Sequence, residues 1–282
     1  MHTVTLPELL IEPIVRLALL EDLTPAGDLT AMAALPAGHT WQGVLRTREP
    51  AVLAGLESAC LALRLIDPSV KVRQLSDSGA QLEAGQVFLK LEGDARSIVT
   101  AERTMLNFLG HLSGVATLTR QYVTAIKDFD AKVTCTRKTT PGLRILEKHA
   151  VRLGGGSNHR HGLGDAVLIK DNHIAAAGSI GVAVAQARDV AGHMRVIEIE
   201  VDTLEQLQEA LAHRPDCILL DNMSLADLRQ AVAMAAGEVI LEASGNVRLE
   251  TIRDIAATGV DFISVGAITH SARRIDMGLD AA

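Results

Sequence analysis

The chain has 282 residues, of which 48% are hydrophobic and 22% are charged, and its formal net charge is −7. This balance excludes a globally basic nucleic-acid-binding protein, although it allows a local basic pocket. Aromatic residues make up only 2% of the chain, so the core must be aliphatic and stacking platforms for nucleic acid are nearly excluded. The length indicates one large domain or two domains.

The three cysteines, Cys60, Cys135 and Cys217, are far apart and form no CxxC pair. Neither a disulfide framework nor a zinc knuckle is indicated, which fits a reducing compartment. Cys135 and Cys217 lie inside apolar segments and are expected to be core residues. No apolar run reaches the roughly 18 residues of a membrane-spanning helix. We therefore expect a cytoplasmic protein with neither a membrane nor a nucleic acid as its partner.

The N-terminal part of the chain has the pattern of a mixed α+β domain with an antiparallel sheet. Apolar residues at helical spacing predict helices over 6–20, 56–65 and 96–127. Short strand-like segments, separated by turn signals, cover 40–53, 70–75 and 86–91. Ser113 and Gly114 predict a break in the last of the helices.

After Asp130 strands and helices alternate regularly. The predicted strands, rich in Val, Ile and Leu, cover 132–136, 166–170, 195–201, 217–220, 238–242 and 261–265. The predicted helices cover 143–153, 178–190, 203–213, 224–236 and 248–258. Gly154, Gly237 and Gly259 follow predicted helices, where a left-handed residue is favoured.

This alternation predicts parallel strands joined by right-handed helical crossovers. Six strand–helix units are too few for a standard eight-stranded barrel. An incomplete six-stranded α/β barrel and an open, doubly wound sheet both remain open at this point.

Polar residues follow or end each of the six predicted strands. They are Thr136-Arg137-Lys138, Lys170 with Asp171-Asn172-His173, Glu198 and Glu200, Asp221-Asn222, Ser244-Gly245-Asn246, and Gly266-Ala267. Ligands bind at the carboxyl ends of the strands in both candidate folds, so we expect these residues to converge on one site. Glu198 shares a strand face with Glu200, and one of the two can serve as a supporting residue.

The residues of this expected site are of three chemical kinds. The cations are Arg137, Lys138, Arg160 and Lys170, with His159 beside them. Arginine and lysine bind carboxylates and phosphates. The carboxylates Glu200 and Asp221 can hold Mg²⁺ or stabilise a developing cation. Backbone N–H groups at Ser244-Gly245 and Gly266 can face a phosphate. Together they indicate a pocket for a polyanion and a metal ion.

Two other chemistries use the same residues. His159, His161 and His173 resemble a zinc site, but Arg160 stands between two of these candidate ligands and argues against a metal there. Lys170 at a strand end can form a Schiff base, as in barrel aldolases. A Schiff-base lyase is therefore the main alternative to a pocket that binds a polyanion.

Residues 136–173 read TRKTTPGLRILEKHAVRLGGGSNHRHGLGDAVLIKDNH, and this long motif closely resembles the quinolinate phosphoribosyltransferase family. The resemblance extends over nearly the whole chain: ED and GDLT within 21–30, AERTMLNFLGHLSGVATLT at 101–119, IEIEVDTLEQ at 197–206, LLDNMS at 219–224, EASGN at 242–246 and SVGAITHSA at 264–272. Two residues depart from the family pattern: Gly110 stands where a larger residue is expected, and Asn246 stands where a second glycine is common.

The resemblance implies an N-terminal α+β sandwich domain over 1–115 and an incomplete six-stranded α/β barrel over 116–282. It also implies a homodimer in which the N-terminal part of one chain closes the barrel mouth of the other; a higher oligomer is left open. The implied pentosyl transfer joins quinolinate to phosphoribosyl pyrophosphate with Mg²⁺ and yields nicotinate mononucleotide, pyrophosphate and CO₂, a step of de novo NAD synthesis.

The resemblance also implies roles for individual residues. Arg137, His159, Arg160 and Lys170 would surround the quinolinate carboxylates, and Arg103 would reach them from the partner chain. Lys138 would contact the phosphoribosyl donor, and Glu200 and Asp221 would face the ribose and Mg²⁺. Lys138, Lys170, Glu200 and Asp221 form the expected catalytic set. The 5′-phosphate is expected at Ser244-Gly245 and Gly266-Ala267, and Thr139, Asn246 and Val265 complete the expected substrate-binding set.

The family also includes a phosphoribosyltransferase of the molybdenum-transport-associated type, which remains an alternative. A phosphosugar-binding or regulatory protein would bind the same ligands without turnover.

Overall fold

The structure, a computed structural model, describes residues 6–282, which form two compact units. The first, here called the sheet unit, comprises the chain up to Arg120 together with Thr139–Gly155 and Ser271–Ala282. The second, the barrel unit, comprises Gln121–Lys138 and Gly156–His270. Because compactness groups segments that are separate in the sequence, the division into domains 1–115 and 116–282 stays a prediction.

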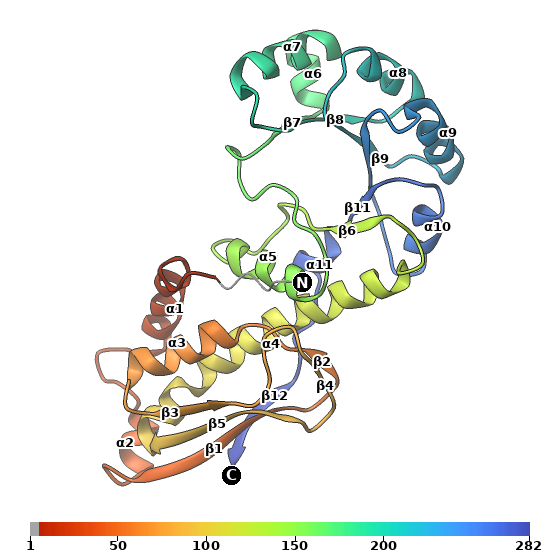
Figure 1. The fold of residues 1–282 in the computed structure, drawn as a ribbon. Helices are drawn as coiled ribbons and strands as arrows, with labels where there is room; N and C mark the ends of the chain where they lie inside the picture. The colour runs from red at the N-terminus through yellow and green to blue at the C-terminus, as the bar shows by residue number, and fades with distance from the viewer. Residues whose placement is uncertain (1–5) are drawn as a thin grey trace. The chain divides into compact units, whose positions relative to one another are not determined.

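The sheet unit is built on a four-stranded antiparallel sheet with the strand order β12-β1-β5-β3 (Figure 1). Its strands are β1 (Thr40–Thr47), β2 (Ala51–Val52), β3 (Lys71–Gln74), β4 (Gln81–Leu82), β5 (Val87–Asp94) and β12 (Met277–Ala281), of which β2 and β4 pair separately. Its helices are α1 (Glu8–Asp22), α2 (Leu29–Ala34), α3 (Leu56–Ile66), α5 (Arg144–Leu153) and α4 (Ala95–Ala125) up to Arg120. Leu45 and Leu89, paired across β1 and β5, are fully buried in an aliphatic core.

The predicted break at Ser113 and Gly114 is wrong, because α4 runs without interruption from Ala95 to Ala125. Ser113 Oγ accepts a hydrogen bond from the N–H of Ala54 at 2.9 Å, so this serine ties the helix to a neighbouring segment. Gly114 lacks a side chain because a Cβ there would clash with the carbonyl oxygen of Arg273. Both residues therefore allow other segments of this unit to pack closely against α4.

The sequence pattern missed α2, β4 and β12, and it joined β1 and β2 into one strand. β12 contains Gly278 and Asp280, which have low strand propensity. It forms because it pairs with β1 and because Asp280 makes ion pairs with Arg46 at 2.9 Å and Arg48 at 2.7 Å. Such long-range partners cannot be read from five residues of local sequence.

The barrel unit contains a six-stranded parallel sheet with the order β6-β11-β10-β9-β8-β7. Its strands are β6 (Lys132–Thr134), β7 (Val167–Ile169), β8 (Ile197–Val201), β9 (Cys217–Asp221), β10 (Ile240–Ser244) and β11 (Phe262–Ser264). Its helices are α6 (Asp171–Ala177), α7 (Ile180–Ala191), α8 (Leu204–Ala212), α9 (Leu225–Ala235), α10 (Ile252–Ala256) and α11 (Ala267–His270).

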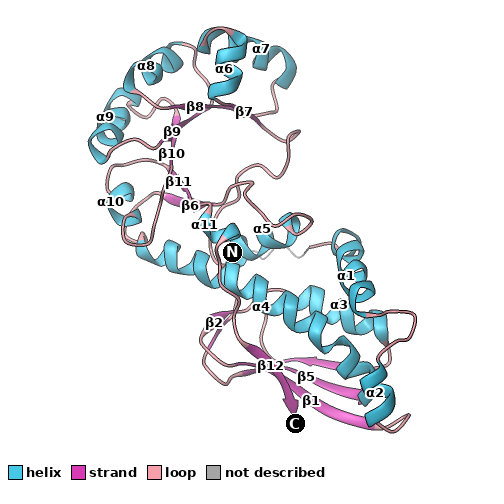
Figure 2. Cartoon of the chain, turned by 180° about the vertical axis from the view of Figure 1, so that it is seen from behind, coloured by secondary structure: helices cyan, strands magenta, loops and turns pink. Residues whose placement is uncertain are grey.

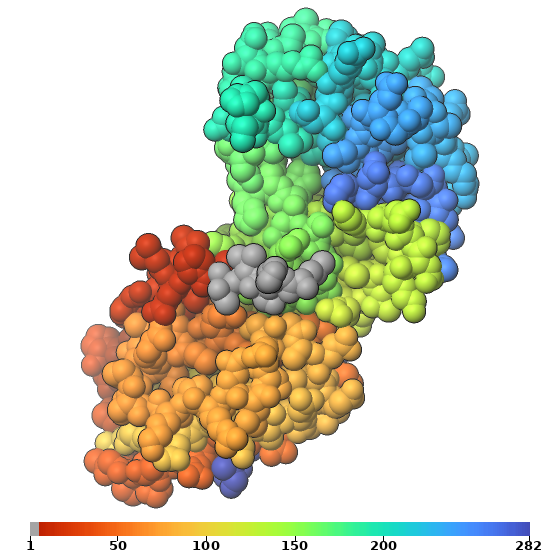
Figure 3. Space-filling view, in the orientation of Figure 1, coloured from red at the N-terminus to blue at the C-terminus, as the bar shows by residue number. Residues whose placement is uncertain are grey.

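This sheet is an incomplete α/β barrel, as predicted. The strands follow an arc, and α7 to α10 lie on its outer side, whereas a doubly wound sheet would carry helices on both faces (Figures 1 and 2). Side chains of α7, α8 and α9 form much of the outer surface of this unit in the space-filling view (Figure 3). β6 and β7 are the edges of the order, so the barrel is open between them. Ser157 pairs with Thr134 along the free edge of β6.

Local signals at the ends of the helices were mostly informative. Thr203 and Gln206 form a capping box at the start of α8, and Gly237 and Gly259 adopt the predicted left-handed conformation with φ of 80° and 95°. The expectation for Gly154 is wrong, since its φ is −69°. A Cβ at Gly154 would press against the carbonyl oxygen of Ala116, so this glycine permits a close approach to α4.

Other differences concern short elements. α6 was not predicted, and α10 is shorter than the predicted helix over 248–258. No helix among residues 6–282 has both the length and the apolar composition needed to span a membrane.

Candidate active site in the barrel unit

A pocket of about 400 Å³ lies within the barrel unit, at the carboxyl ends of its strands. It is lined by Thr136, Arg137, Lys138, His159, Arg160, Leu168, Lys170, Glu200, Leu219, Asp221, Glu242, Ser244 and Ser264. These residues come from all six strands or the segments next to them. The predicted convergence of charged groups on one rim is therefore present within this unit.

The two-residue period of the strands decides which side chains reach the pocket. On β9, Leu219 and Asp221 line the pocket while Ile218 and Leu220 are fully buried. The same alternation places Glu200 of β8 at the pocket. Isoleucine and leucine thus anchor the strands in the apolar core, while the alternate positions face the pocket and include the charged side chains.

Arg160 is held in the pocket by one backbone contact. Its Nη1 donates a hydrogen bond to the carbonyl oxygen of Ala166 at 3.2 Å, whereas its buried Nε has no hydrogen-bond partner among the described residues. Burial, and next the positive charge of Arg137, lower the pKa of the Arg160 guanidinium from its ordinary value. An anion bound between these arginines would relieve both penalties.

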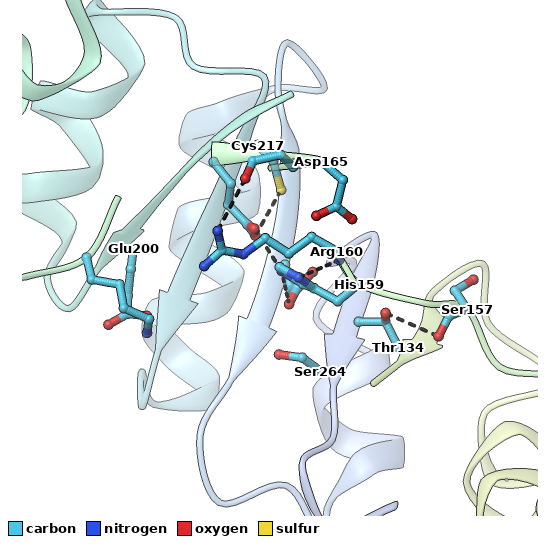
Figure 4. A network of polar contacts seen from close by, with 12 residues as sticks. Thr134, Ser157, His159, Arg160, Asp165, Glu200, Cys217 and Ser264 are labelled. Carbon is cyan, nitrogen blue, oxygen red and sulfur yellow. Dashed lines mark hydrogen bonds and ion pairs between the residues drawn. The ribbon is translucent and has the colours of Figure 1, made fainter. Parts of the chain in front are cut away.

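His159, labelled in Figure 4, lies beside the buried carboxylates of Glu198 and Glu242. Its Nδ1 accepts a hydrogen bond from the N–H of Arg160 at 2.8 Å, which leaves the proton on Nε2. Nε2 then donates to Glu198 at 2.9 Å and lies 3.8 Å from Glu242. Glu198 also accepts a hydrogen bond from the Cys217 thiol at 3.5 Å. These contacts orient the imidazole at the edge of the pocket.

The cysteines of this unit are core residues, as predicted. Cys135 is fully buried and Cys217 nearly so. Burial, and next the carboxylate of Glu198, raise the pKa of the Cys217 thiol. This thiol therefore stays protonated and serves as a hydrogen-bond donor.

His159, Glu198 and Glu242 are the one group of three among the described residues whose metal-binding atoms lie close together. The group includes neither His161 nor His173, so the three histidines of the zinc alternative do not assemble. The hydrogen bond from His159 to Glu198 already uses the histidine proton, and Arg160 follows directly in the chain.

Lys170 and Glu200 form an ion pair at the mouth of the pocket. Lys170 is 46% exposed and Glu200 13% exposed, so the pair lies between solvent and the interior. The backbone N–H of Lys170 also donates to Nδ1 of His173 at 2.9 Å, which anchors the start of α6. A lysine whose amino group is engaged in an ion pair is suited to binding anions and poorly suited to attack on a carbonyl.

Lys138 lies in a loop whose backbone is fixed on two sides. Its N–H donates to Thr136 Oγ1 at 3.0 Å, and its carbonyl oxygen accepts from Thr269 Oγ1 of α11 at 2.8 Å. Gly266 lies against it, because a Cβ there would be 3.3 Å from Cδ of Lys138. The backbone of Lys138 is therefore fixed, whereas the exposed end of its side chain is free to move.

The other predicted residues differ in their positions. Val265 is fully buried, so only its backbone can face a ligand. Thr139 Oγ1 accepts a hydrogen bond from Arg144 at 3.0 Å within the sheet unit. Arg103 is exposed on α4, also in the sheet unit.

Sequence reasoning missed several pocket residues, of which Glu242 is the most informative. Glu242 and Ser264 both line the pocket, and each lies two residues before a strand-end residue that was predicted. Strand alternation alone would have found them. Glu198 and Glu200 were predicted to share a strand face, with one of the two as a supporting residue; Glu200 lines the pocket, whereas Glu198 contacts His159.

Comparison with known proteins gives matches over nearly the whole chain. A family model described as the N-terminal domain of quinolinate phosphoribosyl transferase matches residues 28–113, and one described as the C-terminal domain matches residues 115–280. The carboxylating nicotinate-nucleotide pyrophosphorylase of Mycobacterium leprae (strain TN) is 47% identical over 271 residues, covering 94% of this chain and 95% of the relative.

Two further matches agree. A probable carboxylating nicotinate-nucleotide pyrophosphorylase of Bacillus subtilis (strain 168) is 41% identical over 261 residues, covering 93% of this chain and 90% of the relative. The solved structure of the nicotinate-nucleotide pyrophosphorylase from Francisella tularensis has a TM-score of 0.95 at 42% identity, covering 99% of this chain and 98% of that chain.

Proposed function

The chain belongs to the quinolinate phosphoribosyltransferase family, and we propose that it transfers the phosphoribosyl group of phosphoribosyl pyrophosphate to the ring nitrogen of quinolinate, with loss of CO₂. The products are nicotinate mononucleotide and pyrophosphate, so the reaction is a step of NAD biosynthesis. The observation that carries the proposal is the pocket whose lining brings together four cations and three carboxylates, among them Glu200 and Asp221.

The cations account for the acceptor substrate. Quinolinate is a dianion, and Arg137, Arg160 and Lys170 supply compensating charge within one pocket. The lowered pKa of Arg160 reflects a desolvated, repelled guanidinium, which gains most from an arriving carboxylate. Holding both carboxylates aims the ring nitrogen at the sugar carbon that it attacks.

The carboxylates account for the donor substrate. Cleavage of the bond between ribose and pyrophosphate develops positive charge on the sugar, which Glu200 and Asp221 can stabilise. Binding of quinolinate to Lys170 would release Glu200 from its ion pair and leave it facing the sugar. Once ribosylated, the ring nitrogen is cationic and stabilises the electron pair left on the neighbouring ring carbon when its carboxylate departs as CO₂; that carbon then takes up a proton from water to give nicotinate mononucleotide. The 5′-phosphate is assigned to the backbone at Ser244-Gly245 and Gly266-Ala267.

Mg²⁺ is part of this proposal. Glu200 and Asp221 line the same pocket and offer oxygen ligands, the donor type that Mg²⁺ prefers when it also binds substrate phosphates and water. When bound, the ion would neutralise charge on the departing pyrophosphate. The roles given to Lys138, Thr139 and Val265 remain part of the same proposal.

The proposal also includes a cytoplasmic homodimer in which Arg103 completes the partner's pocket. Arg103 is exposed, as this role requires. Helices α1 and α2 expose large apolar side chains, including Leu9, Leu17, Leu20 and Met32. Exposed apolar surface of this kind marks interaction sites. The three cysteines are free thiols, which fits a reducing compartment.

The reaction is tested by incubating the protein with quinolinate, phosphoribosyl pyrophosphate and Mg²⁺. Nicotinate mononucleotide and CO₂ should appear in equal amounts. Nicotinate is the matched control acceptor, because it lacks the second carboxylate, and it should give little product. Turnover of nicotinate but not of quinolinate would replace the proposal with a phosphoribosyltransferase that does not decarboxylate.

A further inference from the structure

Two asparagines occupy facing turns at the carboxyl ends of β9 and β10. Asn222 follows Asp221, and Asn246 lies two residues after Ser244; their φ angles are 53° and 50°. The N–H of Asn222 donates to the carbonyl oxygen of Ser244 at 2.9 Å, which ties the two turns together. Both residues therefore adopt a left-handed conformation that most side chains avoid and asparagine tolerates.

Their side chains form a directed relay that ends on Asp221. Asn246 Nδ2 donates to Asn222 Oδ1 at 3.2 Å, and Asn222 Nδ2 donates to Asp221 Oδ2 at 2.6 Å. An amide has one carbonyl oxygen and one amino group. Because Asn246 engages the oxygen of Asn222, the amino group of Asn222 must face the carboxylate.

The absence of a side chain at Gly245 leaves room for this relay. A Cβ at Gly245 would clash with the amide of Asn222, so the asparagine side chain lies directly against the glycine backbone. The amide of Asn222 is thus bounded by Gly245, by the donor of Asn246 and by its own bond to Asp221. These three contacts hold the amide in one orientation.

Of these three residues, only Asp221 lines the pocket. Among the described residues, the pocket lining includes Asp221 but neither asparagine. A hydrogen bond to one carboxylate oxygen of Asp221 restricts its rotation and directs the other oxygen, Oδ1, elsewhere. We propose that Asn222 and Asn246 are positioning residues, which hold Asp221 in the orientation required by the phosphoribosyl donor. This inference rests on the proposed function.

Glycine variants isolate the side chains, because glycine adopts a positive φ without strain. Asn222→Gly, Asn246→Gly and the double variant would be compared with wild type. The matched control is Ala236→Gly, which makes the same backbone change at a φ of 48° at the end of α9, outside the pocket. It should leave every kinetic and binding constant unchanged.

Two readouts are needed: kinetic constants for both substrates, and binding of phosphoribosyl pyrophosphate with Mg²⁺ by titration calorimetry. Asn222→Gly should weaken donor binding about tenfold, the scale of one hydrogen bond to a charged group. Asn246→Gly should weaken it about threefold, since it acts at one remove. The KM for quinolinate should stay within about twofold, because Arg137, Arg160 and Lys170, which are assigned to this substrate, are unchanged.

The double variant tests whether Asn246 acts on Asp221 through Asn222. If Asn246 acts through Asn222, the double variant will match Asn222→Gly alone. Fully additive effects, or an equal rise in the KM for quinolinate, would overturn the inference while wild-type turnover upholds the proposed function. A wild-type protein that neither binds the donor nor forms product would remove both.

Discussion

At the scale of single residues, Arg160 is the side chain whose surroundings most clearly suit it to bind a carboxylate. Its guanidinium is partly desolvated, it lies near Arg137, and its Nε has no hydrogen-bond partner among the described residues. Removal of one partner from a bidentate, desolvated charge pair costs on the order of 2–5 kcal/mol of binding free energy. Asp221 differs from it, because a carboxylate at the sugar acts chiefly as charge develops.

We therefore expect Arg160→Ala and Asp221→Ala to fail in different ways. Arg160→Ala should raise the KM for quinolinate roughly 30-fold or more. Asp221→Ala should lower kcat about 100-fold and weaken binding of the phosphoribosyl donor, while it leaves quinolinate affinity nearly intact. Steady-state kinetics with each substrate varied would measure this split. Arg229→Ala, which removes an exposed arginine from α9, is the control. If Asp221→Ala changed only the KM for quinolinate, the role given to this carboxylate would be wrong.

At the scale of elements, the barrel strands were predictable because their signal is local. Each is a short apolar run followed by polar residues, and the alternation along β8 and β9 follows from strand geometry. β12 and the continuity of α4 were not predictable, because both depend on segments far away in the sequence. Asn222 and Asn246 belong to the same class: their residue types suggest turns, but only the facing register of β9 and β10 brings their amides together.

Gly114 tests the packing explanation for α4. The predicted helix break treats this glycine as a weak point, whereas the structure makes it a contact point for the backbone at Arg273. Gly114→Ala improves helix propensity, so a purely local effect would stabilise the protein by about 1 kcal/mol. The clash should instead destabilise it by about 3 kcal/mol.

Chemical denaturation would measure the sign of this change. Gly164→Ala is a suitable control, because a Cβ there meets no heavy atom within 4 Å and its φ is not positive. A stabilised Gly114→Ala protein would show that the close approach of the C-terminal segment to α4 does not exist in solution.

For the whole molecule, the arrangement that matters is the proposed dimer. A lone arginine on a helix is ordinarily a solvated surface residue, and Arg103 by itself would be read that way. Family membership and the exposed apolar residues of α1 and α2 favour a different role. A two-fold dimer builds two identical sites, each completed by the other subunit.

Subunit complementation tests this sharing directly. Arg103→Ala and Lys138→Ala chains should each form inactive dimers, because every pocket lacks one cation. After subunit exchange, a mixed dimer has one pocket with both cations and one pocket with neither. With half of the dimers mixed and one pocket of two intact, about one quarter of wild-type activity should return. Exchange would be verified independently by tagging the two chains. If mixed dimers form and remain inactive, Arg103 does not act across the interface, because only a residue supplied by the partner can be restored by mixing.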